Sequence, residues 1–93
     1  MSRSARLKPN ELVPAWPEGP APDAIGEVAR VFASNLRRAI GGRSIRAAAE
    51  ACGINHATLI GILDVRAWPD METIAKLERG LDAALWPGRV TPR

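Results

Sequence analysis

The sequence contains only one cysteine and one histidine among its 93 residues. A single cysteine cannot form a disulfide within the chain, which is typical of proteins of the reducing cytoplasm. A zinc site needs three or four ligands, and Cys52 and His56 are the only residues of these two types. We therefore expect no metal centre, and we expect no other cofactor.

Long apolar runs and phosphate-binding motifs are also missing. No apolar segment approaches the ~20 residues that span a bilayer, and the first residues lack the apolar core of a signal peptide. Gly41-Gly42 lacks the spacing of a phosphate-binding loop, and no histidine is placed to activate Ser44 as a nucleophile. We expect a cytoplasmic protein that is not an enzyme, does not bind a membrane and has no small-molecule ligand.

Proline is concentrated near the start of the chain. Five of the eight prolines fall between Pro9 and Pro22, where apolar periodicity is weak. Residues 1–23 are therefore predicted to form a flexible arm, basic at first and then proline-rich. Residues 24–87 would form one small domain, and residues 88–93 a short tail.

Apolar periodicity predicts an all-α domain of four or five helices without strands. The helices are expected over residues 24–40, 44–52, 55–65, 69–79 and 81–86. Asp23 can cap the first helix, and Gly41-Gly42 would end it. Pro69 is suited to the first turn of the fourth helix, Gly80 would end that helix, and Pro87 would stop the fifth.

The second and third predicted helices form a tight pair. Ser44 and Asn55 carry side chains that can cap their first turns. Gly53 stands where the chain must turn, and glycine adopts a left-handed conformation without steric cost. The small Ala48 and Ala49 would let a neighbouring helix approach closely. Such a pair can present its second helix to the major groove of DNA.

From about Val28 to Leu85, the chain resembles the Cro/repressor (Xre-type) helix-turn-helix family. The segments that carry the resemblance are Ala48-Ala49, Gly53-Ile54-Asn55, Thr58-Leu59-Ile60-Gly61-Ile62, Trp68-Pro69, and Ile74, Ala75 and Leu77. They match, in order, the family's Leu-Ala pair, Gly-Val-Ser turn, Thr-Ile-Ser-Arg-Ile run, proline-led helix start and following helix. The resemblance implies a lambda-repressor-like fold, a DNA-binding regulator of bacterial or phage type, and a homodimer.

The resemblance implies double-stranded DNA as the partner and residues 55–65 as the recognition helix. The expected DNA-binding residues are Arg43, Ser44, Arg46, Asn55, His56, Ala57, Thr58, Ile60, Gly61 and Arg66. Arg43 and Arg46 flank the start of a helix and are the first candidates for phosphate contacts. His56 can reach a base edge or a phosphate. The alternative for these side chains is that they are merely solvated.

Positive charge is concentrated in the region of the predicted pair. Residues 30–68 contain six arginines against Glu50 and Asp64, whereas residues 9–29 contain four acids and no base. A basic surface of this kind fits a phosphate backbone. A small protein can also use such arginines only for solubility.

The N-terminal arm and the end of the domain leave two further questions open. Arg3, Arg6 and Lys8 could reach along DNA, or could belong to a disordered tail. Trp16 instead suggests that the arm packs on the domain or on a partner. The predicted fifth helix, with Leu81, Leu85 and Trp86 as its apolar residues, is the expected dimer surface.

The groove-facing surface departs from the family pattern. Ala57, Ile60 and Gly61 stand where polar residues are usual, and Val65 replaces a usual glycine. An apolar surface can read thymine methyl groups or depend on DNA shape. It can equally bind a protein. The alternative function is therefore a protein-interaction module, such as an accessory or antitoxin-like subunit that binds through the third helix.

Overall fold

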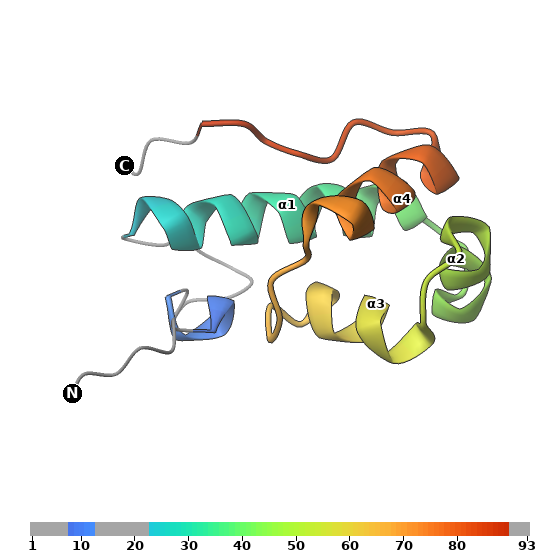
Figure 1. Ribbon diagram of the computed structural model, residues 1–93, viewed down its shortest axis with the longest axis horizontal. Helices are drawn as coiled ribbons and strands as arrows, with labels where there is room; N and C mark the ends of the chain where they lie inside the picture. Colours follow the sequence, from blue (N-terminus) through green and yellow to red (C-terminus); the bar gives the residue numbers. More distant parts are fainter. Residues whose placement is uncertain (1–7, 13–22, 90–93) are drawn as a thin grey trace.

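The computed structural model describes residues 8–12 and 23–89, and within them it contains helices but no strand (Figure 1). In chain order the elements are the 3-10 helix η1 (Pro9–Glu11) and the α-helices α1 (Ala24–Ile40), α2 (Ile45–Cys52), α3 (His56–Leu63) and α4 (Met71–Leu81). The predicted all-α fold is confirmed at this level, and four of the five predicted α-helices are present.

Helix α1 begins and ends where the sequence predicts. The carboxylate of Asp23 accepts a hydrogen bond of 2.8 Å from the backbone N–H of Ile25, so it caps the first turn. Gly41 follows the last turn with a φ of 61°, a conformation that glycine adopts most easily. The buried residues of its predicted inner face are Phe32, Leu36 and Ile40, with Val28 half-buried.

One apolar core joins the four α-helices. Its largest fully buried side chains include Leu36 from α1, Leu59 from α3 and Leu77 from α4. Helix α2 contributes the small residues Ala48 and Ala49, both buried. Because these side chains are short, α2 packs closely against both α3 and α4.

Helix α3 is shorter than the predicted 55–65, because the chain turns left-handed just beyond it. Val65 has a φ of 53°, and its N–H donates to the carbonyl of Ile62 (3.1 Å). The N–H of Arg66 donates back to the carbonyl of Gly61 (2.8 Å). This pair of bonds is a Schellman motif, which ends a helix and here stops α3 at Leu63.

Helix α4 begins and ends two residues later than predicted. Asp70, not Pro69, precedes the first turn, and its carboxylate accepts from the N–H of Thr73 (2.8 Å). Gly80 lies inside the helix and does not end it. Asp82 takes that role with a φ of 51°. Asparagine and aspartate tolerate this left-handed conformation better than most residues.

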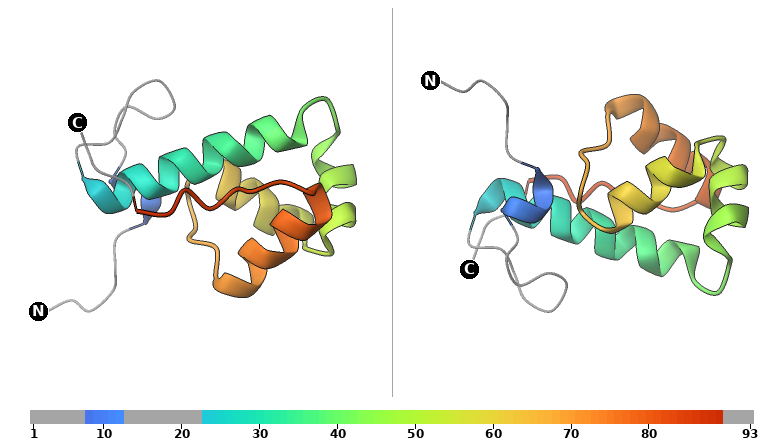
Figure 2. Two further views of the ribbon diagram at one scale, coloured as in Figure 1. Left: turned by 90° about the horizontal axis from the view of Figure 1, so that it is seen from above. Right: turned by 90° about the horizontal axis from the view of Figure 1, so that it is seen from below.

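The predicted fifth helix over residues 81–86 is wrong beyond Leu81. After α4 the chain runs back, without helix, beside α1 (Figures 1 and 2). The Glu78 carboxylate accepts hydrogen bonds from the N–H groups of Leu85 (2.8 Å) and Trp86 (2.9 Å), and the side chain of Asn35 donates to the Leu85 carbonyl (2.9 Å). These bonds replace those that a helix would make.

Part of the predicted arm belongs to the folded body. Helix η1 packs on α1, with Pro9 buried and the following residue, Leu12, against the backbone at Gly26. A Cβ added at Gly26 would lie 2.6 Å from the Leu12 carbonyl oxygen, so only glycine fits there. The expectations for Arg3, Arg6 and Trp16 concern positions outside the described residues.

Candidate nucleic-acid interface

The α2–α3 pair is fixed by caps at both of its helix starts and by the turn between them. The Ser44 hydroxyl oxygen accepts from the N–H of Ala47 (3.0 Å). The side-chain oxygen of Asn55 accepts from the N–H groups of Ala57 (2.7 Å) and Thr58 (3.4 Å). Gly53 has a φ of 68°, in the left-handed region. Both cap predictions and the glycine turn are confirmed.

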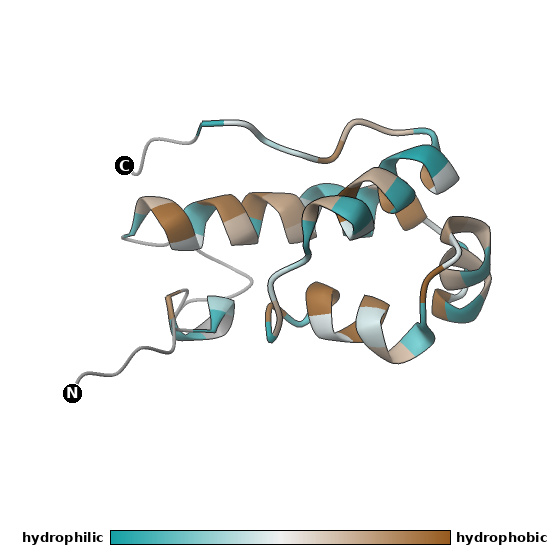
Figure 3. Ribbon diagram, viewed as in Figure 1, coloured by the Kyte–Doolittle hydropathy of each residue, from teal (hydrophilic) through white to brown (hydrophobic). Residues whose placement is uncertain are grey.

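The exposed part of α3 is its first turn. Ala57 and Thr58 are exposed, His56, Ile60 and Gly61 are half-buried, and the apolar residues Leu59, Ile62 and Leu63 are buried. Helix α3 is hydrophilic at its start and hydrophobic towards its end (Figure 3). In the view from below, no other described helix covers it (Figure 2). The first turn of α3 can therefore contact a partner from solvent, whereas the end of α3 packs in the core.

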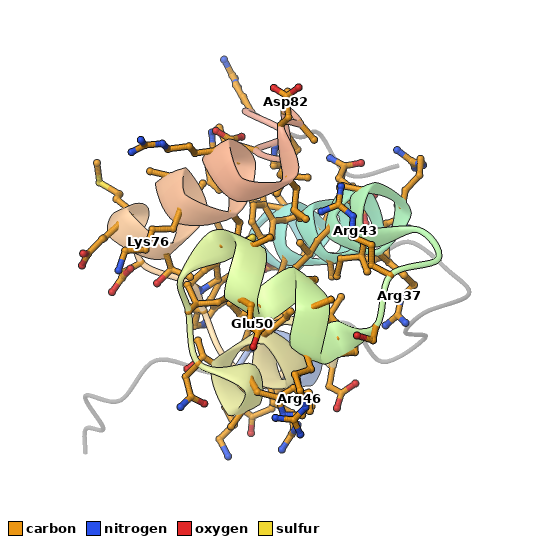
Figure 4. The ribbon with its side chains drawn as sticks, turned by 90° about the vertical axis from the view of Figure 1, so that its right-hand side faces the viewer. Arg37, Arg43, Arg46, Glu50, Lys76 and Asp82 are labelled. Atoms are coloured by element: carbon orange, nitrogen blue, oxygen red, sulfur yellow. The ribbon has the colours of Figure 1, made fainter. Side chains whose placement is uncertain are left out.

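The two arginines at the start of α2 lie on different sides of that helix. Arg46 points to the lower edge, where α3 lies, whereas Arg43 points back over the end of α1 (Figure 4). Both side chains are exposed. Arg43 is also close enough to the buried Cys52 to affect it, since burial raises the pKa of the Cys52 thiol and the positive charge of Arg43 offsets part of that rise. Arg46 is thus the one that shares a surface with α3.

Arg66 is exposed just beyond α3 but is paired with an acid. Its guanidinium lies 3.2 Å from the carboxylate of Asp64, and both side chains are more than half exposed. An exposed pair of this kind is weak, on the order of 0–1 kcal/mol, so a phosphate can compete for the arginine. Asp64 nonetheless lowers the positive charge at this end of the helix.

One arginine that supports α3 cannot be recognised from local sequence. The guanidinium of Arg37, on α1, donates to the carbonyl oxygen of Leu63 (3.2 Å) at the end of α3. Carbonyls at a helix C-terminus lack partners inside the helix and carry partial negative charge. Arg37 therefore ties α3 to α1, over a separation of 26 residues in the sequence.

Cys52 and Ser44, the two side chains considered as nucleophiles, are both engaged in the fold. Cys52 is 5% exposed, with its thiol near the Leu77 carbonyl (3.9 Å), and the Ser44 hydroxyl is occupied as a cap.

Among residues 8–12 and 23–89 there is no group of three or more histidine, cysteine or acidic side chains placed to hold a metal ion. No helix in that part of the chain combines the length and the apolar character needed to cross a bilayer.

Comparisons with protein-family models, with curated proteins and with solved structures give no match to this chain.

Proposed function

We propose that the protein is a small DNA-binding transcriptional regulator without enzymatic activity, in which α2 and α3 form a helix-turn-helix and α3 is the recognition helix. The observation that carries this proposal is the capped α2–α3 pair, joined by a left-handed glycine, with the uncovered first turn of α3 beside Arg46. Two short helices held in this way can place one of them in a major groove.

The chemistry of the first turn of α3 supports a nucleic-acid contact. His56 and Thr58 can each donate or accept a hydrogen bond at a base edge. Ala57 is small and exposed, so it allows close approach and can contact a thymine methyl group. A helix that begins in this way can read DNA with few side chains, together with the shape of the duplex.

Charge around the pair supports binding to the phosphate backbone. Arg46 lies on the same edge as α3, and Arg66 follows the end of the helix. Arg38 is also exposed on the second half of α1. With these contacts the protein would act as a repressor simply by occupying its operator.

The alternative of a protein partner bound to α3 has less support. Ile60, the residue expected to make that surface apolar, is half-buried, and the exposed side chains of α3 are small. The three large apolar side chains that are exposed within residues 23–89 lie on other elements. An apolar partner would find little to bind on α3.

The test is the binding of the full chain to random-sequence duplex DNA, measured by fluorescence anisotropy between about 50 and about 200 mM salt. For the wild type we expect a log–log slope of about −0.9 for each phosphate neutralised, with about three or more such contacts. Arg46→Ala should weaken binding and make the slope shallower by about 0.9, since one phosphate contact is lost.

Arg89→Ala is the matched control, because Arg89 is an exposed arginine in the segment after α4, and that segment runs back beside α1, away from α2 (Figure 1). It removes the same charge and should leave the slope unchanged. If Arg46→Ala and Arg89→Ala behave alike, the assignment of the surface is wrong. A wild-type protein that does not bind DNA even at low salt would refute the proposed function.

A further inference from the structure

We propose that an apolar groove beside α4 binds a small lipophilic cation, such as a quaternary ammonium or phosphonium compound. The groove, here called the apolar groove, has a volume of about 530 Å³. Its larger lining residues include Ile25, Phe32, Trp68, Met71, Ile74 and Trp86. They come from α1, from the loop before α4, from α4 itself and from the segment after it.

The size and the lining of this groove are those of a small-molecule site. Such sites usually have volumes of about 300–1,000 Å³ and are lined by apolar and aromatic side chains with few polar groups. Within residues 8–12 and 23–89, the large apolar side chains that are exposed are Ile25 (60%), Met71 (86%) and Trp86 (54%), and all three line the groove. A molecule with apolar substituents would remove them from water, which favours binding.

The charge in the groove is of one sign. Asp70 is the one charged residue among the described residues that line it. A second hollow of about 410 Å³ shares three lining residues with the groove, and its one charged residue in the described part of the chain is Glu78. Lys76 is close enough to act on Asp70, but it pairs with Glu72 (3.4 Å) and lines neither hollow. Both hollows therefore present negative charge, although the net charge of the chain is +3.

The Asp70 carboxylate is held in place and ionised. It caps α4 by accepting from the backbone N–H of Thr73 (2.8 Å), and the hydrogen bonds from Thr73 lower the pKa of Asp70 from its ordinary value of 3.8. Trp68 and Trp86 line the same groove, and indole is the side-chain ring that attracts cations most strongly. A carboxylate and two indoles in an apolar groove together favour a cation with apolar substituents.

Other occupants fit this groove less well. An anion would be repelled by Asp70, and a neutral apolar molecule would cover the carboxylate without supplying a counter-charge, which is costly. A second copy of the chain would bring another Asp70, and no basic residue, to the contact. A small lipophilic cation matches both the apolar lining and the negative charge.

The groove cannot be recognised from the sequence, which predicts no small-molecule ligand. Ile25, Trp68 and Trp86 belong to three separate segments that only the fold brings together. The described lining residues include neither Arg46 nor the first turn of α3. A ligand in the groove is thus a function beyond the proposed one, and its binding does not depend on DNA.

The experiment is isothermal titration calorimetry of the full chain with tetraphenylphosphonium, and with tetraphenylborate, an anion of nearly the same size and shape. We expect one tetraphenylphosphonium to bind with a Kd of about 100 µM or below. Tetraphenylborate should bind at least about 10-fold more weakly, since Asp70 repels it. Trp86→Ser should weaken tetraphenylphosphonium binding about 10-fold, because it removes an exposed indole from the groove.

Asp70→Asn tests the charge without removing the cap, because asparagine caps helices as well as aspartate does. It should weaken tetraphenylphosphonium binding about 5-fold and keep the wild-type circular dichroism spectrum. Asp82→Asn is the matched control. It makes the same charge change at an exposed position that lines neither hollow, and it should leave the affinity unchanged.

Three results would overturn the proposal. The first is a wild type that binds no tetraphenylphosphonium up to about 1 mM, including a chain whose groove is covered by a second copy and which sediments as a dimer. The second is tetraphenylborate binding that is as tight and equally sensitive to Trp86→Ser. The third is equal affinity of Asp70→Asn and Asp82→Asn for tetraphenylphosphonium.

The failure of this inference is distinguishable from that of the proposed function. Arg46→Ala should bind tetraphenylphosphonium like the wild type, while it loses affinity for DNA. A chain that binds tetraphenylphosphonium but no DNA would refute the regulator and leave the groove assignment in place.

Discussion

The two sides of α4 differ in how they are packed. On one side α4 meets α2 through small residues, and a Cβ added at Gly80 would lie 2.6 Å from the Cα of Cys52. On the other side, the large side chains of Met71 and Trp86 stay exposed and line the apolar groove of about 530 Å³. At Gly80 the two backbones lie too close together for an added methyl group, whereas the large exposed side chains on the other side have no helix facing them.

The two sides of α4 therefore contribute differently to the fold. The closed side holds α2, and through it the α2–α3 pair, in one position relative to the core. The open side contributes less to that position and keeps apolar surface available. Substitutions that add atoms on the closed side should therefore cost the most free energy of unfolding, whereas those on the open side should cost less.

The largest effect is expected for Gly80→Ala. The new methyl group would collide with the backbone of α2 at Cys52 and Ala51, where the nearest atoms lie at 2.6 and 2.7 Å. Overpacking against backbone should cost about 3 kcal/mol, which outweighs the gain of about 1 kcal/mol that alanine brings inside a helix. We expect a net loss of about 2 kcal/mol in the free energy of unfolding, measured by urea denaturation.

Gly42→Ala is the control for this substitution. Gly42 has no atom within 4 Å of the position where a Cβ would stand, and its φ is not in the left-handed region. Its free energy of unfolding should stay within about 0.5 kcal/mol of the wild type. Equal stability of the Gly80 and Gly42 variants would show that α2 and α4 are not tightly packed.

On the open side, Glu78→Gln should have the next largest effect. The Glu78 carboxylate accepts from the N–H groups of Leu85 and Trp86, and so fixes the segment that carries Trp86 to the groove. Glutamine keeps the shape but replaces a charged acceptor by a neutral one, which should cost about 1–2 kcal/mol. Urea denaturation measures the loss, and an increase in tryptophan emission wavelength would report a freer segment. Glu72→Gln, at an exposed position of α4, is the control.

The same carboxylate should make stability depend on pH. The hydrogen bonds from Trp86 and Leu85 lower the pKa of Glu78 from its ordinary value of 4.5. Its contribution is therefore complete well above pH 4.5, and is lost as the pH falls through the lowered pKa of the folded state. Denaturation measured from neutral to acidic pH should show the wild type losing its advantage over Glu78→Gln. A constant difference would contradict this account.

At the start of α3, two substitutions of Asn55 separate stability from DNA binding. Asn55→Ala removes the cap on the N–H groups of Ala57 and Thr58 and should cost about 1 kcal/mol. Asn55→Asp keeps the cap, so stability should hold, but it places a negative charge where a phosphate or base would approach. Its affinity for DNA should fall. Unchanged affinity would argue against a DNA contact at this turn.

The features that were predicted correctly from the sequence are local ones. Asp23, Ser44 and Asn55 cap helices through bonds to residues two or three positions away, so their role can be read from the sequence. The turn at Gly53 is local in the same sense. For this reason the start of α1, its end and the α2–α3 pair all lie close to where they were predicted.

The errors come from contacts between distant residues. The predicted fifth helix fails because the Glu78 carboxylate accepts from the N–H groups of Leu85 and Trp86, which a helix over 81–86 would bond to its own carbonyls. Asn35, 50 residues away, also holds the Leu85 carbonyl in this non-helical path. The sequence predicts a helix end at Gly80, whereas this glycine lies inside α4 and allows the close approach to Cys52. For the candidate site, the sequence identifies Arg43 and Arg46 but does not show that they point to different sides of α2.

The smallest effect on stability is expected for Asp82→Gly, in the turn that ends α4. Asp82 ends α4 with φ 51° and ψ 52°, and its side chain is exposed. Glycine adopts this conformation without steric cost, so Asp82→Gly should raise the free energy of unfolding by about 0.5 kcal/mol. Asp82→Val, which disfavours the same backbone, should lower it by about 1 kcal/mol or more. Urea denaturation measures both changes, and equal stability of the glycine and valine variants would contradict the role given to this left-handed turn.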